Sequence, residues 1–219
     1  MLVALSAVAG FLDAFNFTGL SGTFIAFQTG NTVLVGIAIA DADLSALWPP
    51  LVVILAFLAG GAFTTLVAPN RPGPVRRSRL VLVELLLLAG MVVVALVASG
   101  MSVERLRGPG LFVLISLASA AMAVQTMVVR HVRGQPVSTT FNSGMLANAG
   151  LLLGRTLLAD PDERRLPAIR ASIVGVGVVS YTGGAALGAL GAKGSTLWLL
   201  APVVTVAAMF AHLAWSDRR

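Results

Sequence analysis

The chain has 219 residues, of which 57% are hydrophobic and only 11% charged, and its mean hydropathy is +0.92. Soluble domains carry about 25% charged residues, so this composition excludes an ordinary soluble domain and predicts an all-α integral membrane protein. The net charge of +6 does not indicate nucleic-acid binding, because most arginines lie in short connections between apolar blocks, where they orient a membrane protein.

Eight apolar blocks follow one another along the chain, most of them near the length that crosses a bilayer. They span approximately Leu2–Leu20, Gly22–Ala40, Leu47–Ala68, Leu80–Ser99, Gly110–Val129, Val137–Leu158, Ala168–Leu190 and Ser195–Trp215. The connections are short and contain Pro, Gly and Arg, so none of them could hold a separate soluble domain. We therefore predict a single membrane domain over residues 1–219.

The two halves of the chain resemble each other. A shift of 114 positions places "AFQTG" (Ala26–Gly30) on "TFNSG" (Thr140–Gly144), and "FLAGGAF" in the third block resembles "SYTGGAA" in the seventh. The order and spacing of these matches predict two internal repeats, at about residues 1–100 and 109–216.

The positive-inside rule indicates how many blocks cross the membrane. If all eight cross, the basic residues divide eight to seven between the two sides, which gives no orientation. If the second and sixth blocks enter and return on one side, six net crossings remain and the same residues divide twelve to three. This second count predicts inverted repeats, both termini in the cytoplasm, and Asp41 and Asp43 outside. The same parity follows if the first two blocks form one long broken crossing.

The second and sixth blocks also carry polar residues that are unusual for a membrane segment. The candidates in the two blocks are Gln28, Thr29, Gly30 and Asn31, and Thr139, Thr140, Asn142, Ser143 and Gly144. Non-helical backbone at membrane depth needs such polar groups or a water-filled cavity around it, and glycine permits sharp turns or close helix approach. Because the two clusters lie at corresponding places, we favour a central polar site. The alternative is that these side chains bond membrane helices to one another.

Asp13 lies in the middle of the first block, where a carboxylate costs about 2.5–3.5 kcal/mol on insertion scales. Its functional interpretation is proton or cation coupling, or a substrate contact. Its structural interpretation is a bond to Asn16, to the second block or to Arg130. The repeat places Met127 opposite Asp13, so the acid is not duplicated. Asn16 and Gln125 complete the candidate site.

The remaining polar residues indicate no chemistry. The chain has no cysteine, no HExxH, no GxSxG, no P-loop and no paired intramembrane carboxylates, so we expect neither an enzyme nor a cofactor or metal. Glu84 lies close to Arg79 near the start of the fourth block, and we expect it to pair there or to extend to the membrane surface. Gly150 and Gly154, and likewise Gly184 and Gly188, have the GxxxG spacing of helix packing.

The stretch Gly10–Ala40 resembles the signature of the YoaK-type family of bacterial membrane proteins, which has a Gly-x-x-Asp-Ala opening followed by Thr-Gly-Asn. Those residues are here Gly10, Asp13, Ala14, Thr29, Gly30 and Asn31. A later motif with Gln, then Thr and Gly, is similar at Gln125, Thr139, Thr140 and Gly144, although Ser143 stands in place of a Thr. The resemblance implies a multi-pass protein of the bacterial inner membrane with six spans, and it brings no substrate or activity.

Two functional hypotheses follow. The first is a secondary transporter for an unknown small molecule or ion, with a polar site at the membrane midplane and the coupling charge on Asp13. The second is a non-transporting membrane scaffold or assembly protein, whose polar clusters serve helix packing. The expected partners are the lipid bilayer and, for a transporter, that ligand; a homo-oligomer is compatible with either. A water-accessible cavity that reaches both clusters would favour the transporter, and dry clusters would favour the scaffold.

Overall fold

The computed structural model describes residues 1–68, 74–128, 131–132, 135–136, 139–140, 142–158, 160 and 163–216. Its helices are α1 (Leu2–Gly19), α2 (Gln28–Ala40), α3 (Leu44–Val67), α4 (Pro74–Ser99), α5 (Gly108–Val128), α6 (Asn142–Leu158), α7 (Arg165–Ala192) and α8 (Leu200–Ser216). Two short 3₁₀ helices, η1 (Val103–Arg105) and η2 (Thr196–Leu199), precede α5 and α8. Between α5 and α6, the two-residue strands β1 (His131–Val132) and β2 (Gln135–Pro136) pair antiparallel. The predicted all-helical fold and the order of its blocks are confirmed.

Within the described residues, six helices are long and apolar enough to cross a membrane, in agreement with the six predicted crossings. They are α1, α3, α4 from Arg77 onward, α5, α7, and the stretch Thr196–Trp215 that includes α8. The two remaining helices are shorter: α2 has 13 residues and α6 has 17, which correspond to about 20 and 26 Å of helix, less than the ~30 Å of a hydrocarbon core. The second block therefore forms the shortest α-helix described. Helix α6 is as long as α8, but α8 forms a 20-residue apolar span together with η2, and α6 is not among the six spans.

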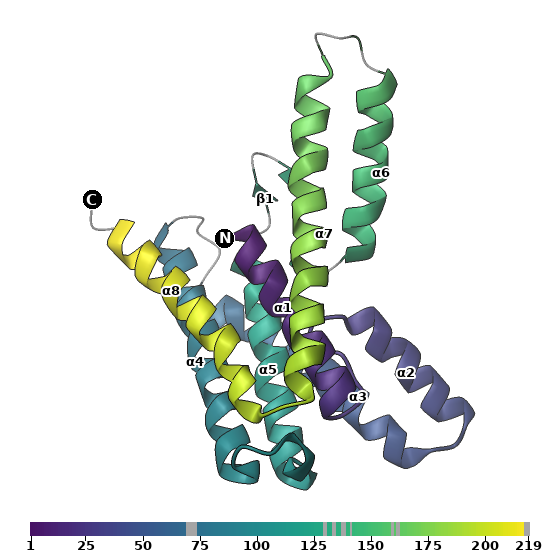
Figure 1. The fold of residues 1–219 in the computed structure, drawn as a ribbon, viewed down its shortest axis with the longest axis vertical. Helices are drawn as coiled ribbons and strands as arrows, with labels where there is room; N and C mark the ends of the chain where they lie inside the picture. The colour runs from purple at the N-terminus through teal and green to yellow at the C-terminus, as the bar shows by residue number, and fades with distance from the viewer. Residues whose placement is uncertain are drawn as a thin grey trace.

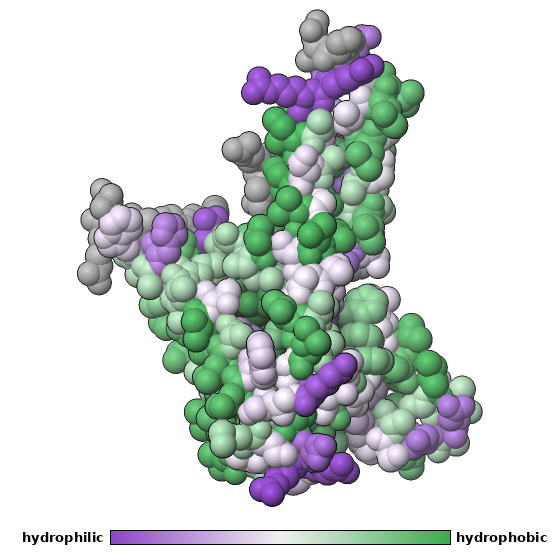
Figure 2. Space-filling view, viewed as in Figure 1, coloured by the Kyte–Doolittle hydropathy of each residue, from purple (hydrophilic) through white to green (hydrophobic). Residues whose placement is uncertain are grey.

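The α4–α5 and α7–α8 connections meet at one end of the bundle. Ser102 and Ser195 form an antiparallel backbone bridge, and the hydroxyl of Thr196 donates to the carbonyl of Gly100 at 2.8 Å. The three basic residues that the charge count separated from the others, Arg105, Arg107 and Lys193, lie in these two connections. The start of α1, the end of α8, the end of α6 and the start of α7 lie towards the other end (Figure 1). Figure 2 shows apolar side chains over the flanks, with hydrophilic ones mostly at the ends.

The closest helix pair is α1 with α7, in which glycines let the two backbones touch. A Cβ atom at Gly184 would collide with the carbonyl oxygen of Ala7, and one at Gly188 would collide with that of Phe11. The packing role predicted for Gly184 and Gly188 is confirmed, because an ordinary side chain at either position would force the helices apart. The same prediction for Gly150 and Gly154 was wrong, since a Cβ at either would meet nothing within 4 Å in the described structure.

The other half of the chain uses a related arrangement. Helix α5 packs on α3, where a Cβ at Gly60 would lie 2.7 Å from the carbonyl oxygen of Ala120. Helix α2 packs on α3, and α6 packs on α7. In the predicted repeat α1 corresponds to α5 and α3 to α7, so the first helix of each half packs on the third helix of the other. The repeats and the single domain stay predictions, and this exchange of partners agrees with them.

Candidate functional site

The carboxylate of Asp13 lies at the break that precedes α2. Asp13 is 3% exposed, and its Oδ1 accepts hydrogen bonds from the backbone N–H groups of Ala26 at 2.5 Å and Phe27 at 3.4 Å. The hydroxyl of Tyr181 on α7 donates to the other oxygen, Oδ2. The first N–H groups of a helix have no partner within the helix, and they carry the positive end of its dipole. Ala26 and Phe27 are the two residues before α2, so Asp13 holds the backbone that enters this helix, with only the weaker bond reaching its N-cap, Phe27.

Asn16, one turn further along α1, holds the chain that leaves this helix. Its Nδ2 donates to the hydroxyl of Ser21 at 2.7 Å and to the carbonyl of Thr23 at 2.6 Å. The hydroxyls of Ser21 and Thr23 bond each other at 2.6 Å. Asn16 thus stabilises the non-helical segment between α1 and α2 by replacing hydrogen bonds that a helix would have supplied.

Asn31 closes the same segment from the α2 side. Its Oδ1 accepts from the N–H of Phe24 at 2.9 Å, and its Nδ2 donates to the carbonyl of the same residue at 2.6 Å. Gln28 donates to the carbonyl of Ile25 at 2.9 Å and, more weakly, to the hydroxyl of Ser119 on α5 at 3.5 Å. Asp13, Asn16, Gln28 and Asn31 were predicted together, and they all meet on this one broken segment.

Two members of the first cluster do not join these bonds. Thr29 is exposed on the surface of α2. Gly30 lies beneath two aromatic rings, since a Cβ there would be 2.6 Å from the ring of Phe27 and 2.7 Å from that of Phe24. Gly30 therefore makes room for the rings, which pack edge to face with their centroids 5.2 Å apart.

The second cluster centres on Gln125 of α5, which is fully buried. Its Nε2 donates to the carbonyl of Leu5 on α1 at 3.0 Å and to the hydroxyl of Thr139 at 3.1 Å. The hydroxyls of Thr126 and Thr140 lie 3.1 Å apart and bond each other. Gln125 thus ties the segment before α6 to α5 and α1.

The role of Gln125 in the second half resembles that of Asp13 in the first. Gln125 bonds Thr139, 14 positions later, and Asp13 bonds Ala26 at 2.5 Å, 13 positions later, and Phe27 more weakly at 3.4 Å. Both side chains come from a long helix and hold the segment that leads into a short one. The repeat alignment placed Met127 opposite Asp13, two positions away from this counterpart. An amide carries no charge, so the acid has no charged equivalent here.

The predicted residues at the start of α6 contribute fewer hydrogen bonds to the second cluster. Asn142 is half-buried, and its Oδ1 is buried with no hydrogen-bond partner in the described part of the chain. Ser143 is exposed and Gly144 half-buried. Arg130, proposed as a partner of Asp13, lies outside the described residues.

Helix α5 connects the two clusters without merging them. Ser119 receives the bond from Gln28 and itself donates to the carbonyl of Val53 on α3 at 2.8 Å. Gln125 lies six positions further, about 9 Å along the helix axis. The clusters therefore occupy two levels of the bundle rather than one shared cavity.

Sequence reasoning missed Tyr181 and Ser119. The sequence contains a feature that could have identified Tyr181, because it is the single tyrosine of the chain and lies inside an apolar block. No such feature identifies Ser119, since serines in membrane helices commonly bond their own helix.

The position of Glu84 contradicts the prediction made for it. We expected it to pair with Arg79 or to extend to the membrane surface, but it is 0% exposed. Neither of its oxygens has a hydrogen-bond partner in the described structure. The prediction was wrong because position 84 falls on the face of α4 that packs into the bundle.

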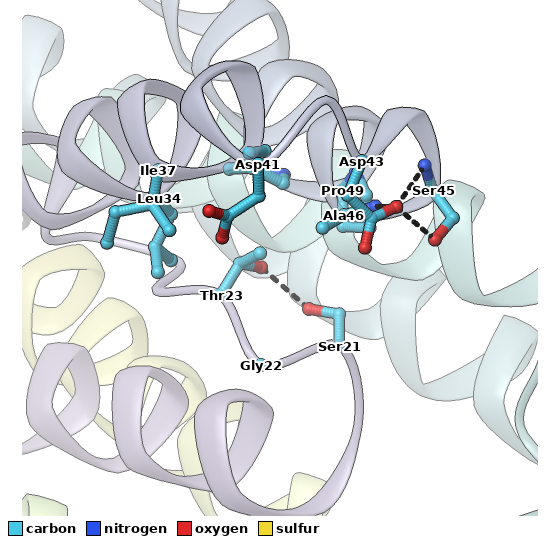
Figure 3. Close-up of a pocket in the computed structure, with 12 residues that line it drawn as sticks. Ser21, Gly22, Thr23, Leu34, Ile37, Asp41, Asp43, Ser45, Ala46 and Pro49 are labelled. Atoms are coloured by element: carbon cyan, nitrogen blue, oxygen red, sulfur yellow. Dashed lines mark hydrogen bonds between the residues drawn. The ribbon is translucent and has the colours of Figure 1, made fainter.

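A cavity of about 300 Å³ opens beside the first cluster (Figure 3). Its walls come from the segment after α1, from α2 and from the start of α3. They are formed by Ser21, Gly22, Thr23, Leu34, Ile37, Ala38, Asp41, Asp43, Ser45, Ala46, Pro49 and Pro50. The cavity reaches Thr23, a partner of Asn16, and does not include Asp13 in its lining.

Asp43 caps α3 at the edge of this cavity. Its Oδ1 accepts from the Ser45 hydroxyl at 2.6 Å and from the N–H groups of Ser45 and Ala46 at 2.8 and 3.1 Å. The bond from the Ser45 hydroxyl, together with the two backbone bonds, holds the pKa of Asp43 below its ordinary value of 3.8. The carboxylate is exposed and carries a negative charge at the cavity mouth.

Comparison with known proteins gives one family. A family model described as "Protein of unknown function (DUF1275)" matches residues 1–213. No curated protein matches the chain, and no solved structure does.

Proposed function

Since the chain belongs to the DUF1275 family, whose description assigns no activity, we propose a function from the geometry: a small secondary transporter for a small molecule or an ion. The observation that carries the proposal is the contact of one buried carboxylate, Asp13, with the backbone that enters the short helix α2 and with Tyr181 of the opposite half. In many transporters, broken helices of this kind form the ligand site near the midplane.

Asp13 is the proposed coupling residue. In the conformation described, its carboxylate accepts hydrogen bonds from the N–H groups of Ala26 and Phe27. Without these bonds, the same N–H groups could bind an anionic or polar group of a ligand. A proton or cation on Asp13 weakens its hold on these groups and on Tyr181. The start of α2 would then be released from α1 and α7. Such a change supplies the difference in ligand affinity between two conformations that coupled transport requires.

The arrangement of the two halves supports the same proposal. Each half has a short helix whose entry is held by a buried polar residue, Asp13 or Gln125, from the preceding long helix. Helices α1 and α5 each pack on the third helix of the other half. We propose that the two halves are inverted repeats that rotate against each other about this interface. The protein would lie in a bacterial inner membrane with both termini on the cytoplasmic side. Membership of the YoaK-type family, which the stretch Gly10–Ala40 resembles, is likewise part of this proposal.

A membrane scaffold is the second candidate, and two observations favour it. The cavity beside the first cluster is lined neither by Asp13 nor by any residue of the second cluster, which is the arrangement expected of a scaffold. The hydrogen bonds of Asn16 and Asn31 end largely on the backbone of the chain's own broken segment. Groups used in this way stabilise the fold and need no ligand. A scaffold would require Asp13 only to hold the backbone that enters α2.

A stability screen followed by flux measurement separates the two. Purified protein is heated with a set of inorganic ions and small metabolites at two pH values, and those that stabilise it are tested in proteoliposomes that contain a pH-sensitive dye. We expect at least one stabilising ligand with pH-dependent flux. Asp13→Asn should abolish that flux while the protein stays folded, and Glu104→Gln, which changes an exposed acid at η1, should not.

Two outcomes would contradict the proposal. Unchanged flux in folded Asp13→Asn removes the coupling role from this residue. A folded protein that no ligand stabilises, and that co-purifies in fixed ratio with another membrane protein, supports the scaffold.

A further inference from the structure

Glu84 lies on the buried face of α4. The buried positions Val81, Glu84, Leu88, Met91 and Ala95 follow the three- and four-residue spacing of one helix face, and each is 0% exposed. Glu84 is seven residues beyond Arg77, where the apolar span begins, and so about 10 Å inside it. The carboxyl group therefore lies in the packed interior of the membrane domain and cannot reach its surface.

No charged group balances this carboxyl in the part of the chain that the structure describes. Helix α4 packs mainly on α5 and α8, with smaller contacts to α3, η1 and η2. Helices α3 and α5 have no ionisable residue, and α8 has only His212, which is exposed. Arg77 and Arg79 on α4 are exposed as well, and the charged residues of η1 lie at the opposite end of α4. An ionised, unpaired carboxylate in such surroundings is far too costly to persist.

Other buried groups with unused hydrogen-bonding capacity lie at the same level. Ala98 lies against Gly110, and Gly90 against Leu117, which sets α4 and α5 antiparallel. This register places Glu84 beside Val124, one residue before Gln125. The Oε1 of Gln125 is buried and has no hydrogen-bond partner in the described structure.

Ser6 on α1 completes this level. Its hydroxyl is also buried without a partner in the described chain, and it follows Leu5, whose carbonyl accepts the bond from Gln125. Helices α4, α5 and α1 thus each carry a buried polar group with unused hydrogen-bonding capacity at about this depth, and none of these groups bonds another in the described structure, although each costs about 1–3 kcal/mol.

We propose that Glu84 is a proton-binding site, whose carboxyl group is held as the neutral acid within a polar layer shared with Gln125 and Ser6. A neutral carboxyl can donate one hydrogen bond and accept others, which suits a layer containing the free Oε1 of Gln125. A divalent metal does not fit, because calcium and magnesium sites need about six oxygen ligands and this layer holds one carboxylate.

This site is distinct from Asp13, whose two oxygens are already bonded to α2 and α7. It goes beyond the proposed transport function, because a proton held by Glu84 is detectable in protein that moves no substrate.

Carbodiimide labelling tests the proposal on the full, unmodified chain in lipid vesicles. Dicyclohexylcarbodiimide reacts with protonated carboxyl groups in apolar surroundings, and mass spectrometry of peptides locates the adduct. We expect the adduct on Glu84, with its yield falling as the pH is raised, and no comparable adduct on the exposed Glu104. Since this measurement needs no variant, it remains decisive even if substitutions prevent folding.

Infrared spectroscopy supplies a second readout. Wild-type protein should show a carboxylic-acid C=O band that is lost in Glu84→Gln and retained in Glu104→Gln. No adduct on Glu84 at any pH, together with identical carboxylic-acid bands in wild type and Glu84→Gln, would overturn the proposal. Protection of Glu84 by sodium at constant pH would also overturn it, in favour of a monovalent cation site.

Discussion

The hydroxyl of Tyr181 on α7 donates a hydrogen bond to Oδ2 of Asp13 on α1, and this bond joins residues 168 positions apart. The other oxygen of the same carboxylate holds the segment that enters α2. One side chain therefore connects two crossing helices and the shortest of the eight α-helices described. Loss of this bond should therefore affect the packing of α1, α2 and α7.

Tyr181→Phe is expected to destabilise the protein by about 1–3 kcal/mol, because it leaves the buried carboxylate short of one donor. Thermal unfolding in detergent would measure the loss. Ser180→Ala is the control, since Ser180 is half-buried and its hydroxyl bonds only the Val176 carbonyl of its own helix at 2.6 Å among the described residues. Equal effects of the two variants would show that the bond to Asp13 carries little stability.

Gly184→Ala should lower stability by about 1–3 kcal/mol or more, because its Cβ would meet the carbonyl oxygen of Ala7 and push α1 from α7. Gly183→Ala is a matched control on the same helix, as its Cβ would meet nothing within 4 Å. Both changes raise helix propensity, so the difference between their unfolding temperatures isolates the close approach. Equal stability would contradict the α1–α7 packing described.

The cap of α3 should be sensitive to acid. The folded pKa of Asp43 lies below its ordinary 3.8, so its stabilisation is complete above that value and is lost as the pH falls through the lowered pKa. Amide-exchange protection of Ser45 and Ala46, corrected for intrinsic rates, should fall in that acidic range. Asp43→Asn should make the protection independent of pH, whereas Asp41→Asn should preserve the wild-type profile. A pH-independent wild type would contradict the capping role.

Single cysteines can test the topology, because the chain has none of its own. With six net crossings, Glu104→Cys and Lys193→Cys should react with a membrane-impermeant maleimide from one side, and Glu163→Cys only from the other. Eight crossings would instead place Glu104 with Glu163 and opposite Lys193. The positive-inside rule predicts labelling of Glu104→Cys and Lys193→Cys from outside the cell. Labelling of Glu163→Cys in intact cells would reverse the orientation.

The sequence by itself determined the class of the fold and its segments. Apolar content and chain breakers are properties of short stretches, so the eight blocks could be predicted without knowing any contact, and the charge count indicated that the second and sixth differ from the other six. The short lengths of α2 and α6 were not predicted. The polar residues before α2 and α6 were identifiable for the same reason, because polarity inside an apolar run needs no partner to be noticed.

Only the tertiary structure decided what those residues bond. Asp13 meets Tyr181 from the far half of the chain, while Asn31 turns back to Phe24, and no spacing rule distinguishes these outcomes. Glu84 was misplaced because a membrane helix is apolar on every side, so its sequence does not indicate which face packs inward. Burial of that carboxyl follows from the contact of α4 with α5 and α8, and this contact exists only when the whole bundle has assembled.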